Sequence, residues 1–132
     1  MMPETELFLK KSATLLSEAK TILSVGLVES AGRAAYLCAF HAAQALILEK
    51  TKKIAKTHRG VRAEFNRLIK DTPLNGDNLT YFLAESYNLK EIADYETGDS
   101  SDILPERVEQ AIQRAKEFHE TVRRYLEAEL TS

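Results

Sequence analysis

Residues 27–50 read LVESAGRAAYLCAFHAAQALILEK, and this stretch decides the fold. Apolar side chains occur on most faces of a helix drawn over it, and a helix that is apolar nearly all round must be buried nearly all round. Its many alanines have small side chains, which let neighbouring helices approach closely. The stretch therefore predicts the central helix of an all-α protein.

The segments on either side of this stretch are also expected to form helices. Apolar residues recur at helical spacing from Pro3 to about Val25, where a proline suits the first turn and Gly26 suits the end. On the other side, Thr57 can cap a helix whose inward-facing residues include Phe65.

Two more helices are predicted in the second half of the chain, at about 78–93 and from Pro105 onward. No stretch alternates in the manner of a β-strand. The residue patterns therefore predict a bundle of about five helices, and a length of 132 residues predicts one domain over 1–132. The connecting segments are expected at 51–56, 71–77 and 95–104.

Composition and charge narrow the classes of protein. Hydrophobic residues make up 44% and charged residues 29%, with a net charge of -2, which argues against a surface covered in positive charge but leaves room for a local basic patch. The single cysteine, Cys38, lies in an apolar run and is expected to pack as a small buried hydrophobe. There is no signal-peptide pattern and no apolar run of about 20 residues. We expect a cytoplasmic protein that does not bind a membrane.

The sequence lacks the common motifs for phosphate loops, metal sites and nucleophilic hydrolysis. There is no glycine-rich phosphate loop, no cysteine pair, no His-Glu-x-x-His and no Gly-x-Ser-x-Gly. The three histidines, His41, His58 and His119, lie on different predicted elements and show no metal-ligand spacing. Neither a metal nor a cofactor is therefore expected.

A first polar group lies on the central helix. At 100° per residue, Arg33 and Tyr36 are about 60° apart and Arg33 and His41 about 80° apart, so one broad face could present all three as ligand-binding residues. Alternatively, Arg33 reaches solvent from near the start of the helix and only covers apolar surface with its stem.

A second polar group lies at the end of the fourth predicted helix, where Lys90 and Asp94 form an (i, i+4) pair and Tyr95 follows. If the fold brings this group near His58 and Arg59, a cation, an imidazole and a phenol would surround a helix terminus, which suits a phosphate. The alternative is a solvated salt bridge followed by a tyrosine that caps the helix.

Four landmarks occur in an order that resembles the HEPN family, the higher eukaryotes and prokaryotes nucleotide-binding domains, in its small stand-alone prokaryotic branch. The resemblance spans roughly residues 5–128. The landmarks are Gly32-Arg33-Ala-Ala-Tyr36 with Phe40-His41, then Thr57-His58-Arg59-Gly60, then Ala93-Asp94-Tyr95, and finally Ala115-x-x-Phe118.

The resemblance implies an antiparallel helical bundle that forms a homodimer, with polar residues of two protomers meeting at a cleft. Many members of the family are metal-independent RNases, and many are toxins that a separate nucleotidyltransferase partner neutralises. RNA or a nucleotide is the implied ligand. The family signature is an arginine and a histidine separated by four to six residues, followed in some branches by x-Tyr.

At the corresponding place this chain has Lys90-x-x-x-Asp94-Tyr95, where the branch has Arg-x-x-x-Asp-Tyr. Lysine lacks the bidentate fork of arginine, and aspartate titrates far below neutral pH, so the RNase motif is degenerate. The resemblance implies Lys90, Asp94 and Tyr95 as catalytic candidates, with His58 or His41 as a substitute imidazole, and Tyr95 matches the tyrosine that partner nucleotidyltransferases modify. The candidate ligand-binding residues are Arg33, Tyr36, His41 and Arg59.

The pair Arg114 and His119 also satisfies the arginine–histidine pattern, within the fifth predicted helix. Residues five apart on a helix point about 140° apart, so we interpret this match as accidental.

Three functional hypotheses follow, and the first is favoured. The chain could be a nucleotide- or RNA-binding regulatory module that pairs with a nucleotidyltransferase-type protein. It could instead be an active metal-independent endoribonuclease toxin, or a non-catalytic helical adaptor. The low net charge and the missing arginine–histidine pair favour the first hypothesis over the second, and the ordered polar landmarks disfavour the third. Whether the protein is an enzyme stays open.

Overall fold

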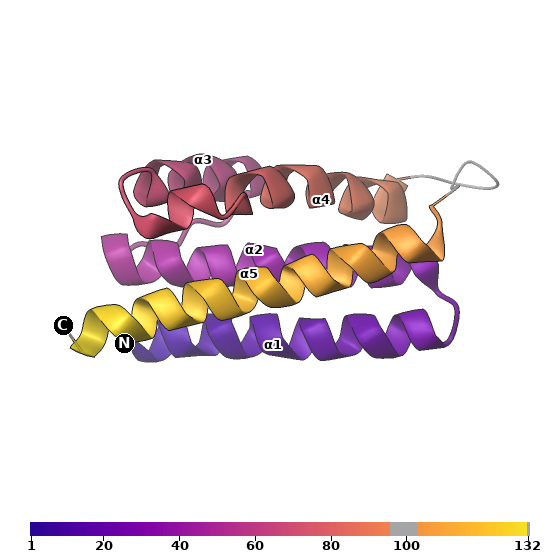
Figure 1. Cartoon of the computed structure of the whole chain (residues 1–132), viewed down its shortest axis with the longest axis horizontal. Helices are drawn as coiled ribbons and strands as arrows, with labels where there is room; N and C mark the ends of the chain where they lie inside the picture. The colour runs from indigo at the N-terminus through magenta and orange to yellow at the C-terminus, as the bar shows by residue number, and fades with distance from the viewer. Residues whose placement is uncertain (96–102, 132) are drawn as a thin grey trace.

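The computed structural model describes residues 1–95 and 103–131, and these ranges contain five α-helices, one short 3-10 helix and no strand (Figure 1). The all-α prediction is therefore confirmed. The elements are α1 (Pro3–Ser24), α2 (Val28–Thr51), α3 (His58–Ile69), η1 (Pro73–Gly76), α4 (Leu79–Tyr95) and α5 (Pro105–Thr131).

The central position of α2 is confirmed, because α2 packs against α1, α3, α4 and α5. Figure 1 shows α3 and α4 on one side of α2 and α1 on the other, with α2 and α5 running opposite to α1 and α4. Ala35, Tyr36 and Ala39 of α2 have no exposed surface. A Cβ atom on Gly32 would lie only 3.3 Å from the Cβ of Leu89, so the small residues of α2 do permit a close approach by α4.

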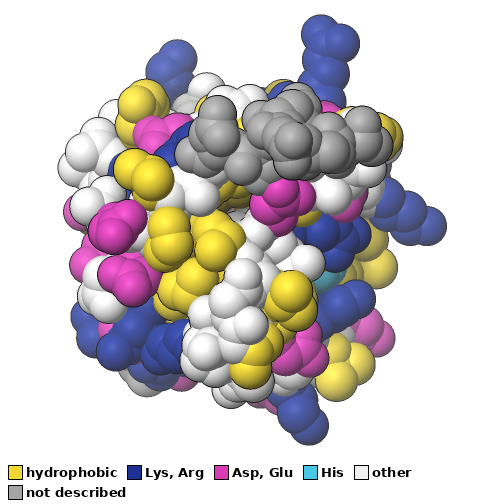
Figure 2. All heavy atoms as spheres, turned by 90° about the vertical axis from the view of Figure 1, so that its right-hand side faces the viewer, with side chains coloured by type: hydrophobic (Ala, Val, Ile, Leu, Met, Phe, Trp, Pro, Cys, Tyr) yellow, Lys and Arg dark blue, Asp and Glu magenta, His cyan; other side chains and the backbone are white. Residues whose placement is uncertain are grey.

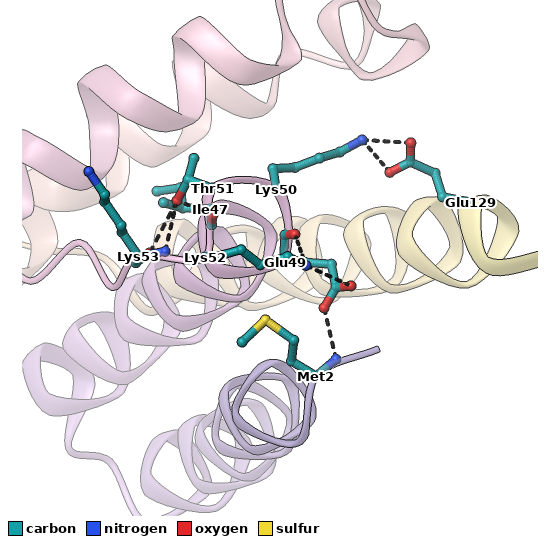
Figure 3. A network of polar contacts seen from close by, with 8 residues as sticks. All are labelled: Met2, Ile47, Glu49, Lys50, Thr51, Lys52, Lys53 and Glu129. Carbon is teal, nitrogen blue, oxygen red and sulfur yellow. Dashed lines mark hydrogen bonds and ion pairs between the residues drawn. The ribbon is translucent and has the colours of Figure 1, made fainter.

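Polar contacts at the end of α2 terminate the helix and hold the start of α1 beside it (Figure 3). Lys52 adopts a left-handed conformation with φ 63°, and its N–H bonds the carbonyl of Leu48 at 2.8 Å. Thr51 Oγ1 accepts the N–H of Lys53 at 3.1 Å. The carboxylate of Glu49 accepts the N–H of Met2 at 2.9 Å. After Lys52 the connector reverses direction and runs back beside α2 to the start of α3.

The start of α3 is fixed by two side chains, of which the sequence predicted one. Thr57 is the cap, as expected, and its hydroxyl accepts the N–H of Gly60 at 2.9 Å. The amide of Gln44, on α2, donates to the carbonyl of Ala55 at 2.8 Å. These contacts place His58 at the first turn of α3, against the middle of α2.

Two boundaries differ from the sequence-based expectation. Helix α4 includes Tyr95, which was expected to begin a loop, because the ion pair between Lys90 and Asp94 and the contact of Lys90 with the Tyr95 ring stabilise the last turn. The expected loop at 71–77 contains η1. Residues 96–102 of the loop expected at 95–104 lie outside the described residues.

The expectation for Cys38 is confirmed, because the residue is fully buried. Burial raises the pKa of its thiol to about 11, so the thiol stays protonated and unreactive at neutral pH. None of the described helices is both long enough and apolar enough to span a membrane.

The close packing around α2 can be tested with one enlarged side chain. Ala39→Leu is expected to lower the free energy of unfolding by about 1–3 kcal/mol, because the added atoms have no space between the surrounding helices. Chemical denaturation measures the change. Ala13→Leu, the same substitution on the exposed face of α1, is the matched control and is expected to have almost no effect. Equal effects of the two substitutions would contradict the central position of α2.

Candidate functional site

Side chains from α2, α3 and α4 converge on the buried ring of Tyr36. The hydroxyl of Tyr36, on α2, lies 2.8 Å from Nδ1 of His58, on α3. The His58 ring also packs against Phe40, with 4.7 Å between ring centroids. The structure therefore brings together two predicted residues that are separated by a helix end and a connector.

Asp94, on α4, joins two cations that come from different helices. Its Oδ1 accepts a hydrogen bond from Nε of Arg33, on α2, at 2.8 Å, and its Oδ2 lies 3.1 Å from Nζ of Lys90. Partial burial alone would raise the pKa of Asp94, but the hydrogen bonds from Lys90 and Arg33 outweigh it and hold the pKa below its ordinary value. Asp94 is therefore ionised at neutral pH, and the same bond raises the pKa of Lys90.

Aromatic rings connect the two halves of this site. The ring of Tyr87 lies 5.5 Å from that of Tyr36 and 5.3 Å from that of His58, measured between centroids. Nζ of Lys90 lies 5.6 Å from the Tyr87 centroid and 5.3 Å from the Tyr95 centroid. Lys90 is only 8% exposed, so its charge is held among rings beside Asp94.

Two residues of the site, Arg62 and Tyr87, were not predicted from the sequence. The guanidinium of Arg62 stacks over Tyr87, with 4.5 Å from Cζ to the ring centroid. Arg62 follows His58 by four residues and Tyr87 precedes Lys90 by three, so each shares a helix face with a predicted residue. This helical spacing was the signal in the sequence that could have identified Arg62 and Tyr87 as site residues. We call the following residues the polar cluster: Arg33, Tyr36, His58, Arg62, Tyr87, Lys90, Asp94 and Tyr95.

Partial burial and two neighbouring cations keep His58 uncharged at neutral pH. Partial burial lowers its pKa below the ordinary value of 6.5, and the positive charges of Lys90 and Arg62 lower it further. Burial also raises the pKa of Tyr36, which therefore keeps its phenol proton. The polar cluster thus combines a neutral imidazole, three phenols, one carboxylate and three cations.

Two predicted ligand-binding residues, His41 and Arg59, make no hydrogen bond or ion pair with the polar cluster within the described part of the chain. His41 Nδ1 donates to Oε1 of Gln44 at 2.6 Å, and its ring faces Phe8 of α1. His41 therefore helps to hold the connector through Gln44. Arg59 is exposed on the first turn of α3.

Arg114 and His119 point to different parts of the molecule. His119 Nδ1 lies 2.9 Å from the buried hydroxyl of Ser12, between α1 and α5. Arg114 instead pairs with Glu85 at 3.8 Å and lies over the Phe82 ring. The two side chains cannot act on one substrate atom, so their match to the arginine–histidine pattern is accidental.

The polar cluster is suited to an anionic, partly aromatic ligand. Guanidinium and ammonium groups bind phosphate oxygens, and tyrosine rings offer stacking surfaces to bases. Figure 2 shows the end of the molecule where α2 begins and α4 ends, with Lys and Arg side chains on one flank next to a partly visible histidine. Within residues 1–95 and 103–131, no group of three His, Cys, Asp or Glu side chains is arranged to hold a metal.

Stability should depend on pH through the histidines. Burial lowers the pKa of His41, His58 and His119 below 6.5, so the unfolded chain binds more protons than the folded one as pH falls through that value. The free energy of unfolding is therefore expected to fall between pH 7.5 and pH 5, by at most about 1.4 kcal/mol per pH unit for each histidine. Asp94 does not contribute there, because its pKa lies below 3.8.

Urea denaturation at several pH values measures this slope, and His58→Gln is expected to make it shallower. A free energy of unfolding that is constant from pH 7.5 to pH 5 would contradict the burial of the histidines.

Comparison with known proteins agrees with the family resemblance. The family model described as "HEPN domain" matches residues 5–125. A relative from Archaeoglobus fulgidus, named "UPF0332 protein", is 33% identical over 94 residues, which cover 71% of this chain and 74% of the relative. The family match extends across all five α-helices, including the three that build the polar cluster. The chain therefore belongs to the HEPN domain family.

Proposed function

We propose that this chain is a HEPN-type module that binds RNA or a nucleotide at the polar cluster, with little or no catalysis of its own. The observation that carries the proposal is the convergence of three cations from three helices. Arg62 and Lys90 lie over the Tyr87 ring, which packs on His58. Arg33 joins them through Asp94, which it shares with Lys90. This gathering of positive charge would favour a phosphate ligand even though the net charge of the chain is -2.

The state of Asp94 favours binding over catalysis. Cleavage of RNA through the 2′-hydroxyl needs a group that gives or takes a proton near neutral pH. Asp94 is ionised and already bonded to Arg33 and Lys90, so it is a weak base and cannot donate a proton. Its carboxylate instead neutralises part of the charge that a phosphate would meet.

We further propose that the module acts as a homodimer with a separate nucleotidyltransferase-type partner, which is the arrangement implied by its family. The support for the partner is Tyr95. This residue ends α4 and is 70% exposed, so a second protein can reach its phenol. Lys90, 5.3 Å from the ring, supplies a positive charge beside it.

Binding is expected to respond to the cations of the polar cluster in a measurable way. Arg33→Ala and Lys90→Ala should each weaken the binding of a short fluorescein-labelled single-stranded RNA. Each should also reduce the magnitude of the slope of log K against log salt concentration by about one, because each removes one phosphate contact. Fluorescence anisotropy at several salt concentrations measures both effects. Arg124→Ala removes an exposed, carboxylate-paired arginine from α5 and should leave both unchanged.

The same samples separate binding from catalysis. Asp94→Asn is expected to bind RNA as tightly as the parent chain or several-fold more tightly, and neither protein should cleave RNA when EDTA is present. Cleavage that resists EDTA and is abolished by Asp94→Asn or His58→Ala would replace our proposal with the endoribonuclease hypothesis. Absence of RNA binding, or an equal loss with Arg124→Ala, would contradict it.

The partner is tested through Tyr95. Incubation with ATP and a small nucleotidyltransferase from the same genome is expected to add one nucleotidyl group, seen as a mass increase on the peptide that contains Tyr95. Tyr95→Phe should abolish the increase. Tyr81→Phe is the matched control, because Tyr81 is also on α4 and is 62% exposed. A mass increase that persists in Tyr95→Phe would contradict the assignment.

A further inference from the structure

The hydrogen bond between Tyr36 and His58 can have either residue as its donor. The two atoms lie 2.8 Å apart, and either the phenol donates to a bare Nδ1 or a protonated Nδ1 donates to the phenol oxygen. The two arrangements differ in which nitrogen of His58 carries the proton. They therefore differ in what the other nitrogen, Nε2, can do for a ligand.

Burial of Tyr36 decides the direction. The side chain has no exposed surface, and Nδ1 of His58 is the one hydrogen-bond partner of its hydroxyl among the residues that the structure describes. If the phenol accepted a hydrogen bond from Nδ1, its own O–H would be buried without an acceptor among the described residues, which is unfavourable. If the phenol donates, its proton is satisfied. The phenol therefore donates to a bare Nδ1.

A neutral imidazole carries one proton, so a bare Nδ1 requires a protonated Nε2. We propose that Tyr36 is a positioning residue that fixes His58 in the Nε2–H tautomer, so that His58 offers a hydrogen-bond donor to a phosphate oxygen of the ligand. The ligand in this statement rests on the proposed function, whereas the tautomer rests on the geometry alone. His58 is thus a binding group in the resting protein and not a general base.

The charges that face His58 agree with this assignment. Partial burial and the positive charges of Lys90 and Arg62 lower the pKa of His58 and outweigh the opposing effect of Glu91 and Asp94, so the ring stays neutral and keeps a single proton. The same tautomer disfavours a metal, because a metal needs a bare ring nitrogen and Nδ1 is already occupied. The titratable groups around the ring are Tyr36 and His41 on α2, Arg62 on α3, and Tyr87, Lys90, Glu91 and Asp94 on α4.

The tautomer can be measured in the ligand-free protein by long-range ¹H–¹⁵N NMR of the imidazoles, with His58 assigned through His58→Gln. We expect Nδ1 of His58 to resonate as a bare nitrogen and Nε2 as a protonated one. In Tyr36→Phe the loss of the donor should produce a mixture of tautomers and raise the pKa of His58, because a hydrogen bond that stabilises the neutral ring is removed. A single cooperative unfolding transition in denaturant would show that the variant remains folded.

Tyr87→Phe is the matched control, because the Tyr87 ring also packs on His58 but forms no hydrogen bond with it in the described residues. This variant should keep the tautomer of the parent chain. A protonated Nδ1 in the parent chain, or an unchanged tautomer in Tyr36→Phe, would overturn the proposal whether or not the protein binds RNA.

The donor role is tested by adding the short RNA used for anisotropy. The Nε2–H proton of His58 should shift as the RNA binds. RNA that binds by anisotropy without shifting this proton would overturn the donor role of His58 and leave the proposed function in place. Failure of RNA to bind at all would instead contradict the proposed function, while the tautomer of the free protein would still be measured.

Discussion

The burial of α2 on nearly every face is the constraint on which the rest of the structure depends. Because the helix is surrounded, each of its buried polar side chains needs a hydrogen-bond partner, either from a neighbouring segment or from α2 itself. Tyr36 meets this requirement through His58 of α3, and Gln44 meets it through the carbonyl of Ala55 in the connector. The position of α3, and with it the polar cluster, follows from these two demands as much as from apolar packing.

The same requirement distinguishes the three histidines. Ser12 donates its only hydroxyl proton to the carbonyl of Cys38 at 2.7 Å, so Nδ1 of His119 must donate to Ser12. His41 donates in the same way to Gln44. Both rings are thereby committed to holding buried structure together. His58 differs because it accepts from its buried partner at a surface lined with cations, which leaves its proton-bearing nitrogen available for a ligand.

Local features of the fold could be predicted from the sequence, because short-range physics determines them. The cap at Thr57 and the apolar surface of α2 depend only on residues close in the chain. The polar cluster could not be derived in this way, since Arg33 and Asp94 are 61 residues apart and their contact depends on how three helices pack. Arg62 and Tyr87 were missed for the same reason. Helical spacing places them beside His58 and Lys90, but it does not say which faces of α3 and α4 meet.

The lysine at position 90 illustrates why a motif is better judged in space than along the chain. Within the sequence, Lys90 stands where the branch has an arginine, and the guanidinium is lost. In the folded protein Arg33 reaches across from α2 and bonds the carboxylate that Lys90 also holds, so a guanidinium and an ammonium share Asp94. The side chain of Arg33 is 45% exposed, whereas that of Lys90 is 10% exposed. The more accessible cation is therefore an arginine after all, supplied by a different helix, and it retains the planar donor geometry that suits phosphate.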